Sequence, residues 1–245
     1  MNENMTMEIK IPKRINPCPI TRATIELVFD SAIPLSTVIG IVYNEFKHDY
    51  PNLRELPTSQ MPDFIRRKEA SLQNSPCYLL SKEEGDYALW VGEKVLSLTN
   101  QGSYVGWEAL RAKFGEMHER IKKISLIKKH ERISVLYSNE FTFNIMEQIN
   151  IAISMQGKYL SDAGTGVRLS LKDDKFITNL NIANDVQMQD KKESAKSSVI
   201  DIATWTGDIT NDIMQELEDC HTKEKRAFFE LLNQDFIENK LNPEY

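Results

Sequence analysis

Residues 78–98 read YLLSKEEGDYALWVGEKVLSL, and this stretch decides the fold. Apolar side chains alternate over residues 78–80, 87–91 and 96–98, which is the two-residue period of a β-strand. Short connections that contain glycine separate the three runs, and strands joined so closely pair antiparallel. The stretch therefore predicts a three-stranded antiparallel meander.

The elements that flank the meander predict a sheet covered by helices. A β-branched and aromatic run over residues 24–29 predicts a strand, and apolar residues with helical spacing from 35 to 46 predict a helix after Pro34. Trp107, Leu110, Phe114, Met117, Ile121 and Ile124 step by three or four residues, which predicts a long amphipathic helix over about 105–127. Residues 51–76 hold four prolines and predict a long connection with at most one short helix, which is a candidate for a mobile or a partner-contacting segment.

The second half of the chain is rich in predicted strands. Alternation predicts strands at 133–143, 149–153, 167–171, 176–182 and 199–206, an exposed loop at 187–198, and a terminal helix over about 208–238. The first half runs strand, helix, three strands, helix. The second half runs strand, irregular link, four strands, helix, and this order is consistent with an internal duplication.

These patterns predict an α+β fold. It consists of one large, twisted antiparallel sheet with the long amphipathic helices on one face. We divide the chain into an N-terminal arm (1–22), a first α+β half (23–130) and a second α+β half (131–245) that shares the sheet.

Composition and charge narrow the class of protein. The chain has 245 residues, 41% of them hydrophobic and 27% charged, which is typical of a globular protein. No apolar run approaches the ~20 residues of a membrane helix, and the N-terminus lacks the apolar core of a signal peptide. We therefore expect a cytoplasmic protein that does not enter a membrane. The net charge of −6 weighs against a general nucleic-acid binder.

No catalytic or cofactor motif is present in the sequence. The cysteines, Cys18, Cys77 and Cys220, are far apart and predict reduced thiols rather than a zinc site or a disulfide framework. The chain has no H-E-x-x-H, G-x-S-x-G or G-K-[ST] element. We therefore predict no cofactor, no metal and no enzymatic activity of a recognised type.

Two charged patterns are candidates for binding. The basic segment 120–132 contains Arg120, Lys122, Lys123, Lys128, Lys129 and Arg132, and residues 51–76 add Arg66 and Arg67. The basic segment could contact phosphate or an acidic partner, or it could complement the dipole at a helix C-terminus. Asp208, Asp212 and Glu216 step by four, which fits either a metal site or, as we expect, a solvated helix face.

Three stretches resemble a bacterial protein family of sporadic distribution and unknown function. They are Pro19–Pro51, with Ile25-Glu-Leu-Val-Phe29 and Tyr50-Pro51; Tyr104-Val-Gly-Trp-Glu108; and Lys223–Leu232, with Phe228-Phe229. The family's Leu-Arg-Tyr-Ile-Asn-like strand reads Val135-Leu-Tyr-Ser-Asn139 here, so its arginine is missing. The resemblance implies an accessory-genome protein of a defence or toxin–antitoxin-type locus, and it transfers no catalytic residue.

Together these observations favour a non-enzymatic interaction protein. It would be a neutralising partner, adaptor or sensor that binds a protein encoded by a neighbouring gene. The alternative is a nucleic-acid-binding module that uses the basic segment 120–132, since a duplicated sheet with helices on its back also resembles the saddle of the TATA-box-binding protein in outline.

Overall fold

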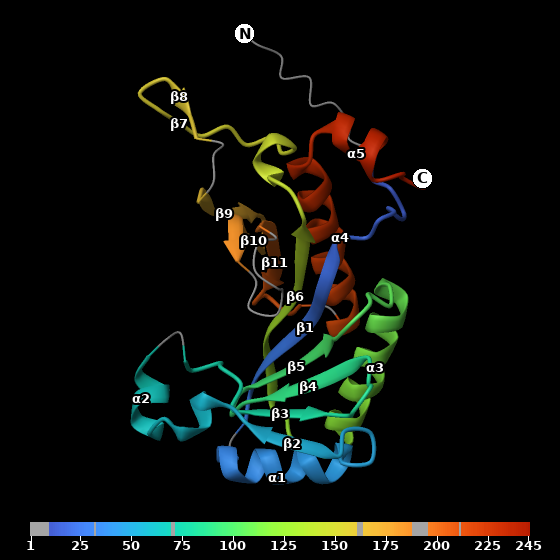
Figure 1. Cartoon of the computed structure of the whole chain (residues 1–245). Helices are drawn as coiled ribbons and strands as arrows, with labels where there is room; N and C mark the ends of the chain where they lie inside the picture. The colour runs from blue at the N-terminus through green and yellow to red at the C-terminus, as the bar shows by residue number, and fades with distance from the viewer. Residues whose placement is uncertain (1–9, 32, 70–71, 161–163, 188–195, 211) are drawn as a thin grey trace.

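The computed structural model describes residues 10–31, 33–69, 72–160, 164–187, 196–210 and 212–245 (Figure 1). The elements of the first half are β1 (Ile20–Asp30), α1 (Leu35–Phe46), β2 (Asn52–Glu55), η1 (Pro57–Gln60), α2 (Asp63–Lys68), β3 (Tyr78–Ser81), β4 (Tyr87–Val91), β5 (Val95–Asn100) and α3 (Trp107–Lys123). Those of the second half are β6 (Lys129–Phe141), η2 (Ile145–Glu147), β7 (Ser154–Met155), β8 (Lys158–Tyr159), β9 (Gly166–Asp173), β10 (Phe176–Gln187), β11 (Lys196–Thr206), α4 (Ile213–Leu231) and α5 (Gln234–Lys240).

Nine strands form one sheet in the order β2-β3-β4-β5-β1-β6-β11-β10-β9. Every neighbouring pair is antiparallel. The predicted α+β class, with a large antiparallel sheet and helices packed against it, is confirmed. Among the described residues, no helix is both long enough and apolar enough to cross a membrane.

The strand order has an internal symmetry about the central pair, β1 and β6. Outward from this pair, the first half adds β5, β4, β3 and β2, and the second half adds β11, β10 and β9. A long helix follows the last strand of each half, α3 in the first and α4 in the second. The first half also has α1 and β2 between its first strand and its meander. In the described part of the second half, only η2 and the two-residue strands β7 and β8 lie between the first strand, β6, and the next long strand, β9.

Both long helices lie on the same face of the sheet, as predicted. Side chains of α3 and α4 share one hydrophobic core with the inward-facing residues of β1 and β6. The helices also touch each other, because the Trp107 ring of α3 stacks on the His221 ring of α4 with 3.9 Å between centroids. A second core, under the end of α4 and under α5, contains Phe141, Ile200 and Phe236.

Three local predictions are wrong. The predicted strand at 149–153 is not a strand, because Ile149 bridges to Leu232 and its neighbour Asn150 caps the end of α4 through the Leu232 carbonyl. Residues 51–76 hold an edge strand, β2, that was not predicted. The predicted terminal helix is two helices, because the chain turns at Asn233, whose side chain caps α5. Most of the predicted loop at 187–198 lies outside the described residues.

Candidate functional site

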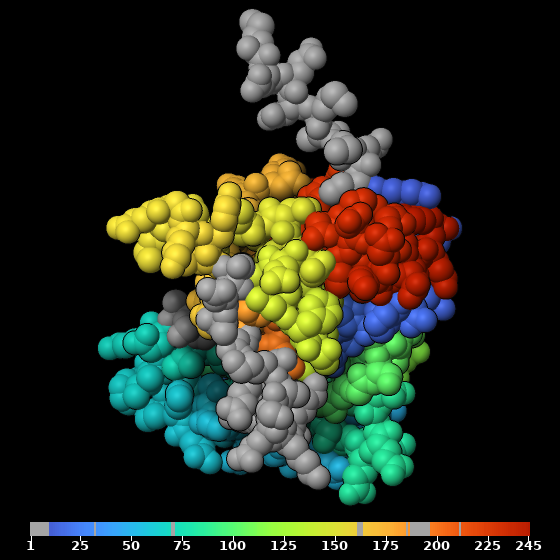
Figure 2. Space-filling model, turned by 45° about the horizontal axis from the view of Figure 1, so that its top comes forward, coloured from blue at the N-terminus to red at the C-terminus, as the bar shows by residue number. Residues whose placement is uncertain are grey.

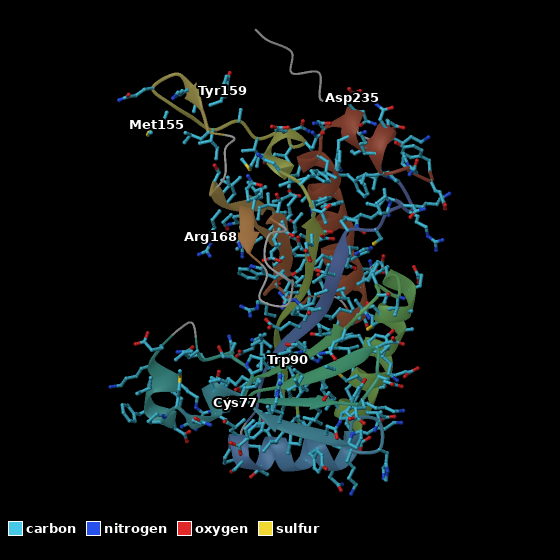
Figure 3. All side chains as sticks on the ribbon, in the orientation of Figure 1. Cys77, Trp90, Met155, Tyr159, Arg168 and Asp235 are labelled. Atoms are coloured by element: carbon cyan, nitrogen blue, oxygen red, sulfur yellow. The ribbon has the colours of Figure 1, made fainter. Side chains whose placement is uncertain are left out.

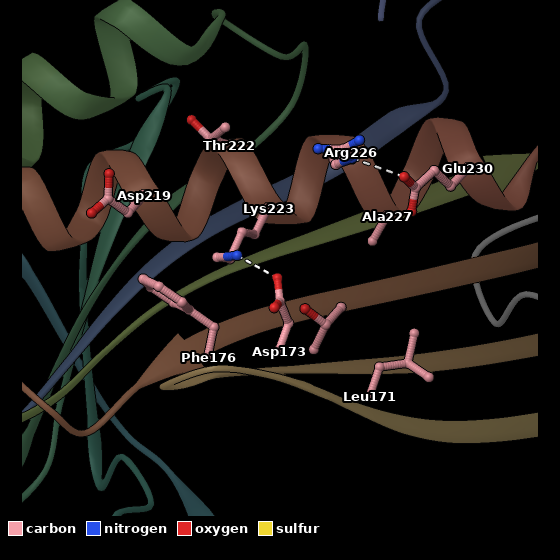
Figure 4. A pocket seen from close by; sticks show the side chains of 10 residues that line it. Leu171, Asp173, Phe176, Asp219, Thr222, Lys223, Arg226, Ala227 and Glu230 are labelled. Carbon is pink, nitrogen blue, oxygen red and sulfur yellow. Dashed lines mark hydrogen bonds and ion pairs between the residues drawn. The ribbon is translucent and has the colours of Figure 1, made fainter. Parts of the chain in front are cut away.

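A groove of about 580 Å³ runs between α4 and the outer strands β9 and β10 (Figure 4). Its lining residues are Leu171, Asp173, Phe176, Thr178, Asp219, Thr222, Lys223, Arg226, Ala227 and Glu230. The strands form the floor and the exposed side of α4 forms one wall. The groove is thus built by three elements, and its facing residues Asp173 and Lys223 are 50 positions apart in the sequence.

Strand β9 exposes two leucines on the helical side of the sheet, Leu171 in the floor of the groove and Leu169 beside it. Leu169 and Leu171 pair across to Leu180 and Thr178 of β10, and Leu180 lies in the core, so all four project to the same face. Leu169 is 36% exposed and Leu171 is 47% exposed. The reason is that α4 packs mainly across β6 and β11 and leaves the outermost strand uncovered.

The first half has a helix in the corresponding place. The strand registers put Leu80 of β3 and Leu171 of β9 in one row that crosses the sheet on the helical face. Leu80 is fully buried, because it shares the first core with Val38, Val42 and Phe46 of α1. The two halves therefore differ in one layer: α1 covers the outer strands of the first half, and the groove takes its place in the second.

Each long helix carries a basic side chain that reaches the outer element of its own half, α1 in the first half and β9 in the second. In the first half, Arg120 of α3 donates to Glu45 at 2.8 Å and pairs with Asp49, and its guanidinium lies 4.2 Å from the centre of the Phe46 ring. In the second half, Lys223 of α4 pairs with Asp173 at the end of β9. Arg120 therefore clamps a helix, whereas Lys223 reaches down to the edge strand itself (Figure 4).

The predicted basic residues do not form one surface. Arg120 belongs to the α1 clamp. Lys122, Lys123, Lys128 and Lys129 are exposed around the end of α3 and the start of β6, and Lys122 pairs with Glu119 one turn earlier on α3. Arg132 lies on the other face of the sheet, where it donates to Glu26 at 2.8 Å.

The two arginines of α2 also have local partners. Arg66 is buried and donates to the Cys77 sulfur at 3.0 Å while it pairs with Asp63. Arg67 is exposed and pairs with Glu93 at 2.9 Å. Arg66 therefore anchors α2 to the residue that precedes β3, and only Arg67 of this pair offers its side chain to solvent.

Buried polar side chains gather where α3, β6 and α4 meet, and sequence reasoning did not identify them. Tyr104 and Tyr137 share a hydrogen bond of 3.0 Å, and Tyr137 lies 3.4 Å from Nδ1 of His221. Burial lowers the pKa of His221 to about 3 and raises the pKa of Glu224 well above its ordinary value. At neutral pH the cluster therefore holds a neutral imidazole, beside a carboxyl whose neutral form is favoured by burial.

Two histidines that lie in repeated His-Glu-Arg triplets come together. Nε2 of His118, on α3, is 3.0 Å from Nε2 of His130, on β6. Burial, followed by the charge of His130, lowers the pKa of His118 to about 4, so the His118 ring is uncharged at neutral pH and the N–H of one Nε2 donates to the other Nε2.

The helix face that carries Asp208, Asp212 and Glu216 was predicted to be solvated, but it is not solvated at all three residues. Asp212 caps α4 by accepting from the Met214 amide, but Glu216 is fully buried and pairs with Lys175 at 2.7 Å. The described residues contain no group of three or more His, Cys, Asp or Glu side chains placed to hold a metal ion.

The cysteines are free thiols, and each lies in a different region of the molecule. Cys77 and Cys220 are buried and Cys18 is exposed.

Comparison of the sequence with protein-family models gave no match, and comparison with curated proteins gave none either.

Proposed function

We propose that this protein is a non-enzymatic protein-interaction component that takes an amphipathic helix of a partner protein into the groove between α4 and β9. One observation carries the proposal. The first half covers its outer strands with α1, and the second half, built on the same strand order, leaves Leu169 and Leu171 exposed in the equivalent place. A groove beside a helix that combines exposed apolar side chains with charged ones is a common receptor for an amphipathic helix.

Helix α1 serves as a template for the chemistry of the occupant. It buries Val38, Val42 and Phe46, spaced by four residues, and offers Glu45 to the cation of the neighbouring long helix. The open groove offers Leu171 and Ala227 as apolar contacts and Lys223 as the cation. We therefore expect a partner helix of about three turns with an apolar i, i+4, i+8 stripe and carboxylates beside it.

The proposed biological setting is a defence or toxin–antitoxin-type locus. It is supported by the resemblance of Tyr104–Glu108 and Lys223–Leu232 to the sporadically distributed bacterial family. In such a setting the partner is the product of a neighbouring gene, and this protein neutralises it, senses it or links it to another component.

A blocking substitution tests the groove. The tagged protein is co-expressed with each neighbouring gene product, and the complex is quantified for the unmodified chain and for Ala227→Arg, which places a long cation in the groove. Ala112→Arg on the exposed side of α3 makes the same change away from the groove. We expect Ala227→Arg to weaken the complex at least tenfold and Ala112→Arg to leave it unchanged. Equal complex formation by both variants would contradict the proposal.

One observation favours the nucleic-acid alternative. Trp90 and Trp205 lie in the same cross-sheet row, on the face away from the long helices, and both are half-buried. Figure 3 marks Trp90 on the lower part of the sheet. Aromatic rings on an open sheet face stack with unpaired bases. Binding of single-stranded RNA or DNA that falls steeply with salt and is lost in Trp90→Ala and Trp205→Ala would put this alternative first.

A further inference from the structure

The edge of the sheet beside the groove has a template in the first half. There, β2 follows α1 after only five residues and pairs antiparallel with β3. In the second half, β9 occupies the position of β3, and no described strand pairs with its outer side. An open edge presents unpaired backbone N–H and C=O groups that accept another strand.

We propose that the partner's chain continues from its helix into a strand that pairs antiparallel with β9 and adds a tenth strand to the sheet. This inference rests on the proposed function, because it places the helix of the same partner in the groove. The unit α1–β2 spans only Leu35 to Glu55, so a segment of about that length can cover both the groove and the edge.

The charges on β9 specify the chemistry of the added strand. Arg168 and Lys172 are exposed, lie on the face opposite Leu169 and Leu171, and have no hydrogen-bond or ion-pair partner among the described residues. Figure 3 shows Arg168 at the outer margin of the sheet. A partner strand that alternates acidic and apolar residues would place carboxylates beside these cations and apolar side chains over the groove.

The same charges disfavour a second copy of this chain as the occupant. If two β9 strands paired antiparallel around Ser170, Arg168 of each copy would face Lys172 of the other. Like charges directly opposite each other destabilise a strand pair, and cations on an edge strand protect it from self-pairing. The edge therefore favours a foreign, acidic strand.

Backbone hydrogen exchange on the co-expressed complex tests the inference. We expect alternate amides of Gly166–Asp173, those that point away from β10, to exchange at least tenfold more slowly in the complex than in the free protein. The double variant Arg168→Glu/Lys172→Glu should weaken the complex at least tenfold. The matched control, Lys122→Glu/Lys123→Glu, makes the same change of charge at the end of α3 and should leave the affinity unchanged.

The outcomes separate the two proposals. A complex that is sensitive to Ala227→Arg but leaves the β9 amides at their free rate overturns strand addition and keeps helix docking. Absence of a complex, or one that is insensitive to Ala227→Arg, overturns both. A free protein with twice the 28.2 kDa chain mass and protected β9 amides would assign the edge to a second copy instead. A loss of affinity in the Lys122→Glu/Lys123→Glu control alone would move the interface to the basic segment and overturn the inference.

Discussion

The two halves of the sheet share a strand order but end differently. The outer margin of the first half is closed by α1 and β2, and β3 beneath them has two of its four residues buried and none exposed. The outer margin of the second half ends at β9, in which only Val167 is buried. Where the first half has α1 and β2, the second half has the β7–β8 hairpin between β6 and β9. This hairpin projects from the body with Met155 and Tyr159 exposed (Figures 2 and 3). The comparison teaches that two halves with the same strand order can differ in how their outer strands are covered: among the described residues, one margin is closed by a helix and a strand and the other is open.

The largest expected effect separates two leucines in the same cross-sheet row. Leu80→Ala removes a fully buried side chain between β3 and α1, and should lower the free energy of unfolding by about 2–5 kcal/mol. Leu171→Ala removes a side chain that is 47% exposed, and should cost less than about 1 kcal/mol. Urea denaturation of both variants measures the difference. Equal losses would mean that the second margin is closed in solution.

The next effect compares Arg120 of α3 with Lys223 of α4. Arg120→Met removes two carboxylate contacts and a contact with the Phe46 ring, and should cost about 1–3 kcal/mol. Lys223→Met removes one ion pair, with the exposed Asp173, and a longer contact of 5.0 Å with the Phe176 ring, and should cost at most about 1 kcal/mol. Thermal unfolding compares them. A larger loss for Lys223→Met would show that the second cation holds its margin together as Arg120 does.

A smaller, pH-dependent effect distinguishes two buried carboxyls of α4. Burial raises the pKa of Glu224 well above its ordinary value, so this group favours the folded state most at low pH, and its contribution is lost as pH rises above about 4.5. Glu224→Gln should match the unmodified protein at pH 4 and be more stable than it at pH 8. Glu216→Gln, which breaks the pair with Lys175, should be less stable at pH 7. Unfolding by urea across this pH range gives both results.

The smallest effect concerns the basic segment. Replacing Lys122, Lys123, Lys128 and Lys129 with Ser should change neither partner binding nor fold, because all four are exposed and none lies in the groove. The unmodified protein should show no duplex DNA binding at physiological ionic strength. Fluorescence anisotropy with labelled duplex checks this expectation. Tight, salt-dependent binding that these substitutions abolish would favour the nucleic-acid alternative.

Local patterns in the sequence predicted most of the sheet and both long helices. The alternation of Tyr87, Leu89 and Val91 and the helical period from Trp107 identify elements whose apolar faces lie in the core. The edge strand β2 was missed because Asn52–Glu55 is exposed throughout and joins the sheet only through its backbone. Glu216 was assigned to solvent because nothing near it in the sequence indicates Lys175, its partner across the fold.

The groove could not be identified in the same way. Leu171 reads as an ordinary strand residue and Ala227 as an ordinary helix residue, and only the packing of α4 leaves a space between them. One signal was available: the order of predicted elements has a helix after the first strand of the first half and an irregular link after the first strand of the second. A missing layer in one of two similar halves is the observation that would have drawn attention to β9.

The central pairing of β1 with β6 has a consequence for how the chain is made. Ile20 pairs with Asn139 and Asp30 with Lys129, so β1 must wait for about 100 further residues before its inner edge is covered. During synthesis at ~5–20 residues per second, the edge of β1 that pairs with β6 therefore stays open for several seconds or longer, even after β5 has been made to pair with the other edge. A truncated product that ends before Lys129 keeps that edge permanently open and is expected to self-associate through it. Premature termination in this gene is thus expected to yield aggregates rather than a working half.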